Sequence, residues 1–245
     1  MKDIYNSITA STLKGKKLLA VLIDPDKAKL ESLSGIIQKI DLSLVTHIFV
    51  GGSIVKEKAT DLVVKEIKKH TKLPIVLFPG DVTQITNNAD AILFLSLISG
   101  RNAEYLIEKH VQSVAKLKDS NLEVIPTGYI LIESGNITAV EHVSRTKPLP
   151  REPIQKIVET AKAGELLGMK LIYLEAGSGA KEPVSETIIK LVKQELQVPL
   201  IVGGGIRTRK QLENAYQSGA DLVVIGTAFE ENESFFEEIK RETIQ

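Results

Sequence analysis

Residues 199–228 read PLIVGGGIRTRKQLENAYQSGADLVVIGTA, and this stretch decides the fold. It holds an apolar run at 199–202, three glycines, a polar segment of helical character over 208–218, a second apolar run at 221–225 and another glycine. Short apolar runs bounded by glycine are typical of strands buried on both faces, and strands joined by a helix pair in parallel. The stretch is therefore predicted to be a strand–helix–strand unit with a glycine loop at the carboxyl end of each strand.

The same alternation extends over most of the chain. Apolar runs that we expect to be strands lie at 17–23, 46–50, 74–78, 91–95, 123–132, 170–175, 199–202 and 221–225. Helices are expected over 27–40, 56–69, 103–118, 152–167, 182–195, 208–218 and 231–243, whereas 81–88 is short and only weakly helical. Eight strand–helix units can close into a barrel, and 245 residues fit one. The prediction is an α/β fold, a single (β/α)8 TIM barrel over 1–245 with an irregular third helix. An open doubly wound sheet is the structural alternative.

The composition narrows the functional classes. Hydrophobic residues make up 43% of the chain and aromatic residues only 4%, so the core must be mostly aliphatic. The 31 basic residues balance the 31 acidic ones, which gives no bulk electrostatic case for nucleic acid. There is no cysteine, which excludes disulfides and thiolate metal sites. The polar N-terminus lacks a signal-peptide core, and no apolar run reaches the roughly 18 residues of a membrane span, so we expect a cytoplasmic protein.

The glycine loops after the seventh and eighth predicted strands are the first candidate site. They contain Gly204 and Gly205, and then Gly226 followed by Thr227. Glycine lets main-chain amides approach an anion closely, and the loops after these two strands are the usual phosphate site of a TIM barrel. The alternative is that these glycines only permit tight turns. Because both loops fall at the two expected strands, we predict phosphate binding.

The end of the sixth strand carries a candidate base. The segment 173–179 reads YLEAGSG, which places Glu175 at the barrel mouth between an apolar strand and two glycines. A carboxylate there is suited to accept a proton from a substrate hydroxyl. The alternatives are a solvated loop carboxylate or a partner of a helix cap. Tyr173, like Tyr129 in the fifth strand, either contacts a ligand or packs in the barrel.

Two oxygen-bearing side chains are candidate metal ligands. Asp24 directly follows the first strand, and Ser53 follows the second. Magnesium sites often combine one or two carboxylates with substrate phosphates, although one carboxylate alone is not a metal motif. Asp26 is better explained as the N-cap of the following helix, and capping is also the alternative for Ser53.

Taken together, the strand ends resemble those of the geranylgeranylglyceryl phosphate synthase family. The matching segments are LIDPDK at 22–27, FVGGS at 49–53, PTGYILIESG at 126–135, YLEAGSG at 173–179, VGGGIRT at 202–208 and VIGTAF at 224–229. They run from the first strand to the eighth, so the likeness covers nearly the whole chain. The bacterial heptaprenyl branch of the family has Lys two places before the metal aspartate. Leu22 stands there instead, which places the chain nearer the archaeal-type group.

The resemblance implies a Mg²⁺-dependent prenyltransferase of ether-lipid synthesis. It would join geranylgeranyl diphosphate to the C3 hydroxyl of sn-glycerol 1-phosphate and form a homo-oligomer, either a dimer or a hexamer. Asp24 and Ser53 become the magnesium site. The glycerol 1-phosphate site becomes Tyr173, Leu174, Glu175, Ala176, Gly177, Ser178, Gly179, Gly204, Gly205, Gly226 and Thr227.

The implied reaction also requires a base and an apolar trough. Glu175 would take the hydroxyl proton, and Phe78, Leu95 and Leu97 are candidates for lining a trough over strands two to four, with ordinary core packing as the alternative. Two other functions stay open. One is another phosphate-handling barrel enzyme, such as a sugar-phosphate isomerase or a thiamin-phosphate-type synthase. The other is a non-catalytic barrel that senses a phosphorylated metabolite.

Overall fold

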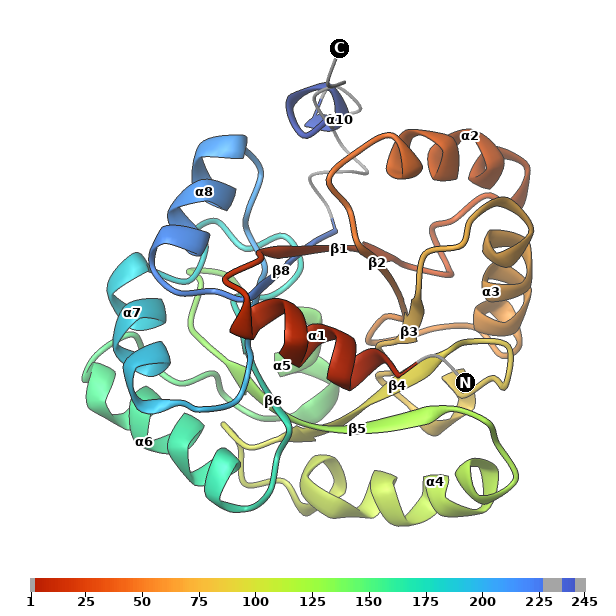
Figure 1. The fold of residues 1–245 in the computed structure, drawn as a ribbon. Coiled ribbons are helices and arrows are strands. Elements are labelled where there is room, and N and C mark those ends of the chain that lie inside the picture. The colour runs from red at the N-terminus through yellow and green to blue at the C-terminus, as the bar shows by residue number, and fades with distance from the viewer. Residues whose placement is uncertain (1–2, 227–234, 241–245) are drawn as a thin grey trace.

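The computed structural model describes residues 3–226 and 235–240, and it is a closed barrel of parallel strands (Figure 1). The strands neighbour one another in chain order, and β8 pairs with β1 to close the sheet. This confirms the predicted TIM barrel. The strands are β1 (Leu18–Ile23), β2 (His47–Val50), β3 (Ile75–Leu77), β4 (Ala91–Leu97), β5 (Glu123–Leu131), β6 (Leu171–Glu175), β7 (Leu200–Gly203) and β8 (Leu222–Ile225).

Helices surround the barrel and create two layers of core. The surrounding helices include α2 (Leu30–Asp41), α3 (Ala59–His70), α4 (Lys109–Lys118), α6 (Ile154–Leu166), α7 (Glu186–Glu195) and α8 (Arg209–Gln217) (Figure 1). Side chains alternate between the layers because successive residues of a strand face opposite sides. In β2, Ile48 and Val50 pack outward beneath the helices, whereas Phe49 packs inside the barrel.

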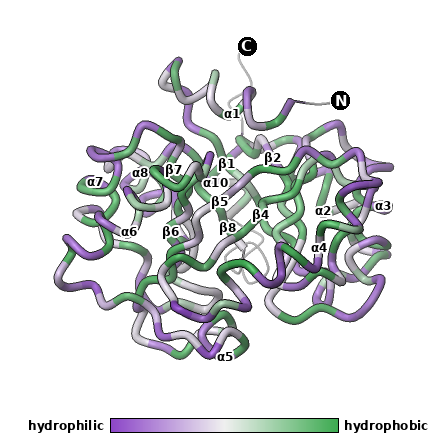
Figure 2. The backbone as a smooth tube through the Cα atoms, turned by 90° about the horizontal axis from the view of Figure 1, so that it is seen from below, coloured by the Kyte–Doolittle hydropathy of each residue, from purple (hydrophilic) through white to green (hydrophobic). Residues whose placement is uncertain are grey.

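The helix α1 (Ile4–Leu13) lies across the end of the barrel where the strands begin (Figure 1). Its buried residues, Ile4 and Ile8, join the interior cluster. This helix was not predicted, because its remaining residues are largely polar and the N-terminus looks like a solvated segment. The short helix α5 (Ala139–Ser144), in a stretch with little periodicity, lies at the opposite end of the molecule (Figure 2).

The predicted capping role of Asp26 is wrong. The helix α2 begins at Leu30, three residues later than expected, and its N-cap is Lys29. Asp26 instead accepts a hydrogen bond from the main-chain N of Lys56 at 2.9 Å, which ties the loop after β1 to the loop after β2. Ser53 does not cap a helix either, because α3 begins at Ala59 after Lys58.

The segment between β3 and β4 contains only the three-residue 3-10 helix η1 (Val82–Gln84), as the weak pattern at 81–88 predicts. After β4 the chain forms a π-helical turn, η2 (Glu104–Glu108), which continues into α4. A full helix is therefore missing from the third unit. Of the last predicted helix, 231–243, the described residues include α10 (Phe235–Glu238). Over the described ranges, no helix has the length and apolar character needed to cross a membrane.

Candidate active site

The carboxyl ends of the strands surround a cavity of about 280 Å³ at one mouth of the barrel. Asp24 and Ser53 line it together with residues after β6, β7 and β8, so the acidic corner and the glycine loops share one chamber. Strand parity explains the arrangement. Tyr173 and Leu171 of β6 face the barrel interior, and Glu175 follows them at the same parity. The predicted site residues that line this cavity are Asp24, Ser53, Glu175, Gly177, Ser178, Gly179, Gly204, Gly205 and Gly226.

Three predicted site residues do not line the mouth. Leu174 points outward into the layer beneath the helices, and Ala176 is fully buried there as well. The main-chain N of Ala176 is already used, because it donates to the carbonyl of Gly203 at 3.0 Å. Tyr173 lies beneath the cavity rather than on its surface. Thr227 lies outside the described residues.

The loop after β7 has a backbone that only glycine adopts readily. Gly204 and Gly205 have φ values of 81° and 73°, in the left-handed region. A Cβ on Gly204 would clash with Oε1 of Glu175 and would lie 2.6 Å from the main-chain N of Gly177. The helix α8 starts just beyond the loop, with a capping box between Thr208 and Gln211. Main-chain amides and the start of a helix thus face the chamber, which is a favourable setting for an anion.

Glu175 is the principal titratable group of the chamber. It is only 6% exposed, and its Oε1 accepts a hydrogen bond from the main-chain N of Gly177 at 2.6 Å. Burial raises the pKa of Glu175 to about 7, against the opposing effect of that hydrogen bond. A carboxylate with this pKa can both accept and release a proton near neutral pH.

An aromatic cluster forms the floor beneath Glu175. Phe78, Tyr129 and Tyr173 pack with ring centroids 5.3–5.9 Å apart. The hydroxyl of Tyr173 is buried and, within the described residues, has no hydrogen-bond partner of acceptable geometry. Burial and then the nearby charge of Glu175 raise the pKa of Tyr173 well above its ordinary value, so this hydroxyl remains a proton donor. A ligand oxygen reaching the floor would satisfy it.

Asp24 and Ser53 form an oxygen-rich corner on the other side of the chamber. Oδ1 of Asp24 accepts from the main-chain N of Asp26 at 3.0 Å, and a Cβ on Gly52 would lie 3.3 Å from the same atom. Within 3–226 and 235–240, no three His, Cys, Asp or Glu side chains gather as a metal site. A cation here would therefore need further oxygens from substrate or water. Mg²⁺ is the ion that suits this mode, because it keeps several waters and binds one or two carboxylates plus phosphates.

Two cationic residues at the mouth were not predicted to belong to the site. Lys27 and Arg207 both line the chamber, and Nη1 of Arg207 donates to the carbonyl of Ala180 at 2.9 Å. Both fall inside the motifs LIDPDK and VGGGIRT, so the position of these motifs at strand ends was the available signal. Their charges favour an anionic ligand.

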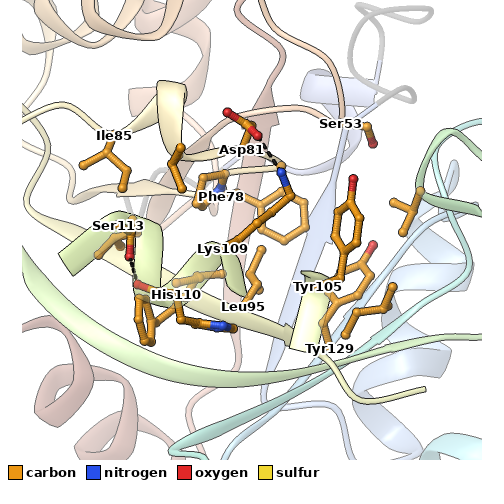
Figure 3. Close-up of a pocket in the computed structure, with 18 of the residues that line it drawn as sticks. Ser53, Phe78, Asp81, Ile85, Leu95, Tyr105, Lys109, His110, Ser113 and Tyr129 are labelled. Atoms are coloured by element: carbon orange, nitrogen blue, oxygen red, sulfur yellow. Dashed lines mark hydrogen bonds and ion pairs between the residues drawn. The ribbon is translucent and has the colours of Figure 1, made fainter. Parts of the chain in front are cut away.

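A second cavity opens beside the first, between η1 and α4 (Figure 3). It has a volume of about 110 Å³ and occupies the place where a regular third helix is missing. The side chains Phe78, Leu95 and Leu97, which were candidates for a trough, line it. It shares Gly52, Ser53, Phe78, Tyr129 and Val140 with the mouth cavity. The polar chamber and the apolar cavity are therefore neighbours with a common wall.

Comparison with known proteins agrees with this arrangement. The family model described as "PcrB family" matches residues 12–244. The chain is 56% identical to geranylgeranylglyceryl phosphate synthase of Flavobacterium johnsoniae, over 97% of this chain and 98% of the relative. It is 43% identical to the synthase of Pyrococcus abyssi, over 93% and 89% of the two chains.

A solved structure shares the whole fold. The synthase of Thermoplasma acidophilum, in complex with its substrate sn-glycerol-1-phosphate, matches with a TM-score of 0.90 at 33% identity, over 98% of this chain and 96% of that one. These likenesses confirm the resemblance seen in the strand-end motifs. The chain belongs to the PcrB family, whose members include the geranylgeranylglyceryl phosphate synthases.

Proposed function

We propose that this protein transfers a geranylgeranyl group from geranylgeranyl diphosphate to the C3 hydroxyl of sn-glycerol 1-phosphate and releases diphosphate. The observation that carries the proposal is the common wall between the polar chamber and the apolar cavity. The reaction joins a small phosphorylated alcohol to a long hydrocarbon, and this pair of cavities suits those two halves. The names of the relatives, and the glycerol 1-phosphate bound in the Thermoplasma acidophilum enzyme, support the same substrates.

The acceptor would be held by main-chain groups. The amides of the loops at Gly204–Gly205 and around Gly177 face the chamber and suit a phosphate. Lys27 and Arg207 add positive charge at the rim. With its phosphate fixed there, glycerol 1-phosphate presents its hydroxyl toward Glu175. Holding both reactants in one chamber removes much of the entropic barrier to their reaction.

The chemical step is a substitution at the first prenyl carbon. The C3 oxygen forms the new bond as the bond between that carbon and the diphosphate oxygen breaks, and Glu175 takes the hydroxyl proton. Asp24 and Ser53 would hold Mg²⁺, which when bound supplies charge to offset the departing diphosphate. The rings of Phe78 and Tyr129 lie at the boundary of the two cavities, where their faces suit the positive charge that an allylic carbon develops.

Incubation with radiolabelled glycerol 1-phosphate and geranylgeranyl diphosphate tests the proposal. We expect lipid-extractable label that depends on Mg²⁺. A sugar-phosphate isomerase or a thiamin-phosphate-type synthase has no need of the apolar cavity, and a metabolite sensor has no need of a base. Absence of labelled lipid under any divalent cation, together with tight binding of a sugar phosphate, would favour one of these rivals.

We also propose that the protein is a homo-oligomer. The family resemblance implies a dimer or hexamer, and Ile107, Val111 and Val114 form an exposed apolar stripe along η2 and α4. Stripes of this kind often mark contacts between protein chains. Light scattering on the wild type and on Val111→Glu tests it, since a monomeric wild type would remove the proposal.

A further inference from the structure

The apolar cavity is crossed by an ion pair. Nζ of Lys109, at the start of α4, lies 2.6 Å from Oδ2 of Asp81, in the loop after β3 (Figure 3). Both residues line the cavity, whose other lining is mostly apolar. The pair joins the two walls that face each other across it, η1 on one side and the η2–α4 segment on the other.

We propose that the Asp81–Lys109 ion pair limits the length of the isoprenoid tail that this protein accepts, by holding the wall at η1 against the wall at α4. The proposal rests on the proposed function, because the cavity sorts tails only if a tail binds in it. It makes Asp81 and Lys109 specificity-determining residues that act on the end of the tail remote from the chemistry.

The pair holds a whole loop, because Asp81 is itself tied to η1. Its Oδ1 accepts bonds from both the main-chain N and the hydroxyl of Thr83, each at 3.0 Å. A second lysine of α4 makes a parallel link, since Nζ of Lys116 donates to the carbonyl of Val82 at 2.9 Å. The wall at η1 therefore moves away from α4 only if these contacts break.

Lys109 is held in place from several directions. Its Nζ also lies 3.5 Å from Oε1 of Glu104 and 5.1 Å from the centroid of the Tyr105 ring. Both partners belong to η2, the π-helical turn before α4, and such turns occur frequently at functional sites. The side chain of Lys109 is 19% exposed and that of Asp81 is 36% exposed, so the pair is partly shielded from solvent.

The pair stays charged over the working range of the enzyme. Burial alone would raise the pKa of Asp81, but the bonds from Lys109 and Thr83 keep it below its ordinary value. Burial alone would lower the pKa of Lys109, but the bond to Asp81 raises it. A hydrocarbon tail long enough to reach this point must separate two opposite charges in a largely apolar setting. Separating a shielded ion pair is strongly unfavourable, so the pair disfavours longer tails.

Chain-length profiles test the proposal. We would measure kcat/KM of the wild type, Lys109→Met, Asp81→Asn and the double variant with farnesyl, geranylgeranyl, farnesylgeranyl and heptaprenyl diphosphates. The ratio of heptaprenyl to geranylgeranyl kcat/KM should rise about tenfold in each single variant, the scale of a lost partly shielded pair. The double variant should match the single ones, because removing the second partner of a broken pair adds little.

Matched variants separate specificity from general damage. Lys109→Arg keeps the charge and should restore the wild-type profile. Lys65→Met removes a lysine 2.8 Å from Asp61, a carboxylate 32% exposed and far from either cavity lining, and should leave the profile unchanged. The KM for glycerol 1-phosphate should be the same in all variants, since none of these residues lines the mouth chamber.

Two results would overturn the inference, and they differ from failure of the proposed function. One is a wild-type chain-length profile in Lys109→Met or Asp81→Asn while geranylgeranyl transfer persists. The other is an equal rise in Lys65→Met. A wild-type protein that forms no prenylglyceryl phosphate from any of the four donors would instead remove the proposed function.

Discussion

The carboxylate of Glu175 and the main-chain N of Gly177 are joined by a hydrogen bond of 2.6 Å inside a site from which water is almost excluded. The bond fixes the direction of the carboxylate toward the chamber. Burial meanwhile raises the pKa of Glu175 to about 7, which is far from its ordinary value. A group arranged in this way carries a cost for stability and an advantage for proton transfer, and both can be measured.

The first prediction concerns the pH dependence of the reaction. Only ionised Glu175 can accept a proton, so kcat/KM should fall about tenfold per pH unit below pH 7 and level off above it. Glu175→Gln should lose about 10²- to 10⁴-fold in turnover while it still binds glycerol 1-phosphate. Steady-state rates between pH 5 and pH 8 check this, and a flat profile over that range would exclude Glu175 as the base.

The second prediction concerns stability. The ordinary pKa of 4.5 applies in the unfolded chain, so between pH 4.5 and about 7 the folded state binds more protons than the unfolded state. Stability contributed by Glu175 is therefore full below pH 4.5 and is lost as pH rises through 7, by about 3 kcal/mol in all. In urea unfolding, Glu175→Gln should exceed the wild type by about that amount at pH 8 and match it near pH 4.5. Parallel curves for the two proteins would contradict the raised pKa.

The third prediction concerns the glycine loop after β7. Gly204→Ala forces a Cβ against Glu175 and Gly177 at a positive φ, so it should weaken glycerol 1-phosphate binding at least about tenfold. Gly35→Ala is the matched control. It lies in α2 with open space around the added methyl, and it should stabilise the protein by about 0.5–1 kcal/mol. Calorimetric titration and thermal unfolding give the two readouts, and unchanged affinity in Gly204→Ala would show that the phosphate binds elsewhere.

The fourth prediction concerns His47, which is buried inside the barrel near α1. Its Nδ1 lies 2.8 Å from the hydroxyl of Thr46, and its Nε2 has no partner among the described residues. Burial lowers the pKa of His47 from 6.5 to about 4, so the unfolded chain takes up a proton first and stability is lost as pH falls from 6.5 to 4. The loss should be about 3 kcal/mol and should be absent in His47→Leu. His142→Leu, at an exposed position, should keep the wild-type acid sensitivity.

The fifth prediction concerns the acidic corner. Asp24→Asn keeps the shape of the side chain but removes its charge, so turnover with Mg²⁺ should fall about 100-fold or more, the scale seen when a group that stabilises developing charge is lost. Binding of glycerol 1-phosphate alone should change little, because the glycine loops lie after β7 and β8 rather than beside Asp24. An equal loss in both quantities would contradict a metal role for Asp24.

The local signals in the sequence were enough to predict the barrel. Each β-strand is a short aliphatic run, and strand parity places Glu175 and Asp24 at the inner mouth once the barrel is closed. What could not be predicted depends on contacts distant in sequence. Asp26 bonds to Lys56 instead of capping a helix, and α1 is held by only two buried residues. The link between Asp81 and Lys109 joins two units of the barrel and leaves no periodic trace in either segment.

A crystal structure with glycerol 1-phosphate, Mg²⁺ and an unreactive thio analogue of geranylgeranyl diphosphate tests the central claim most directly. We predict the glycerol phosphate at about 3 Å from the main-chain amides of Gly204 and Gly205. The diphosphate should lie beside Asp24, with the tail between η1 and α4. Electron density for the tail outside that cavity, or for the glycerol phosphate at the end of the barrel covered by α1, would contradict the account.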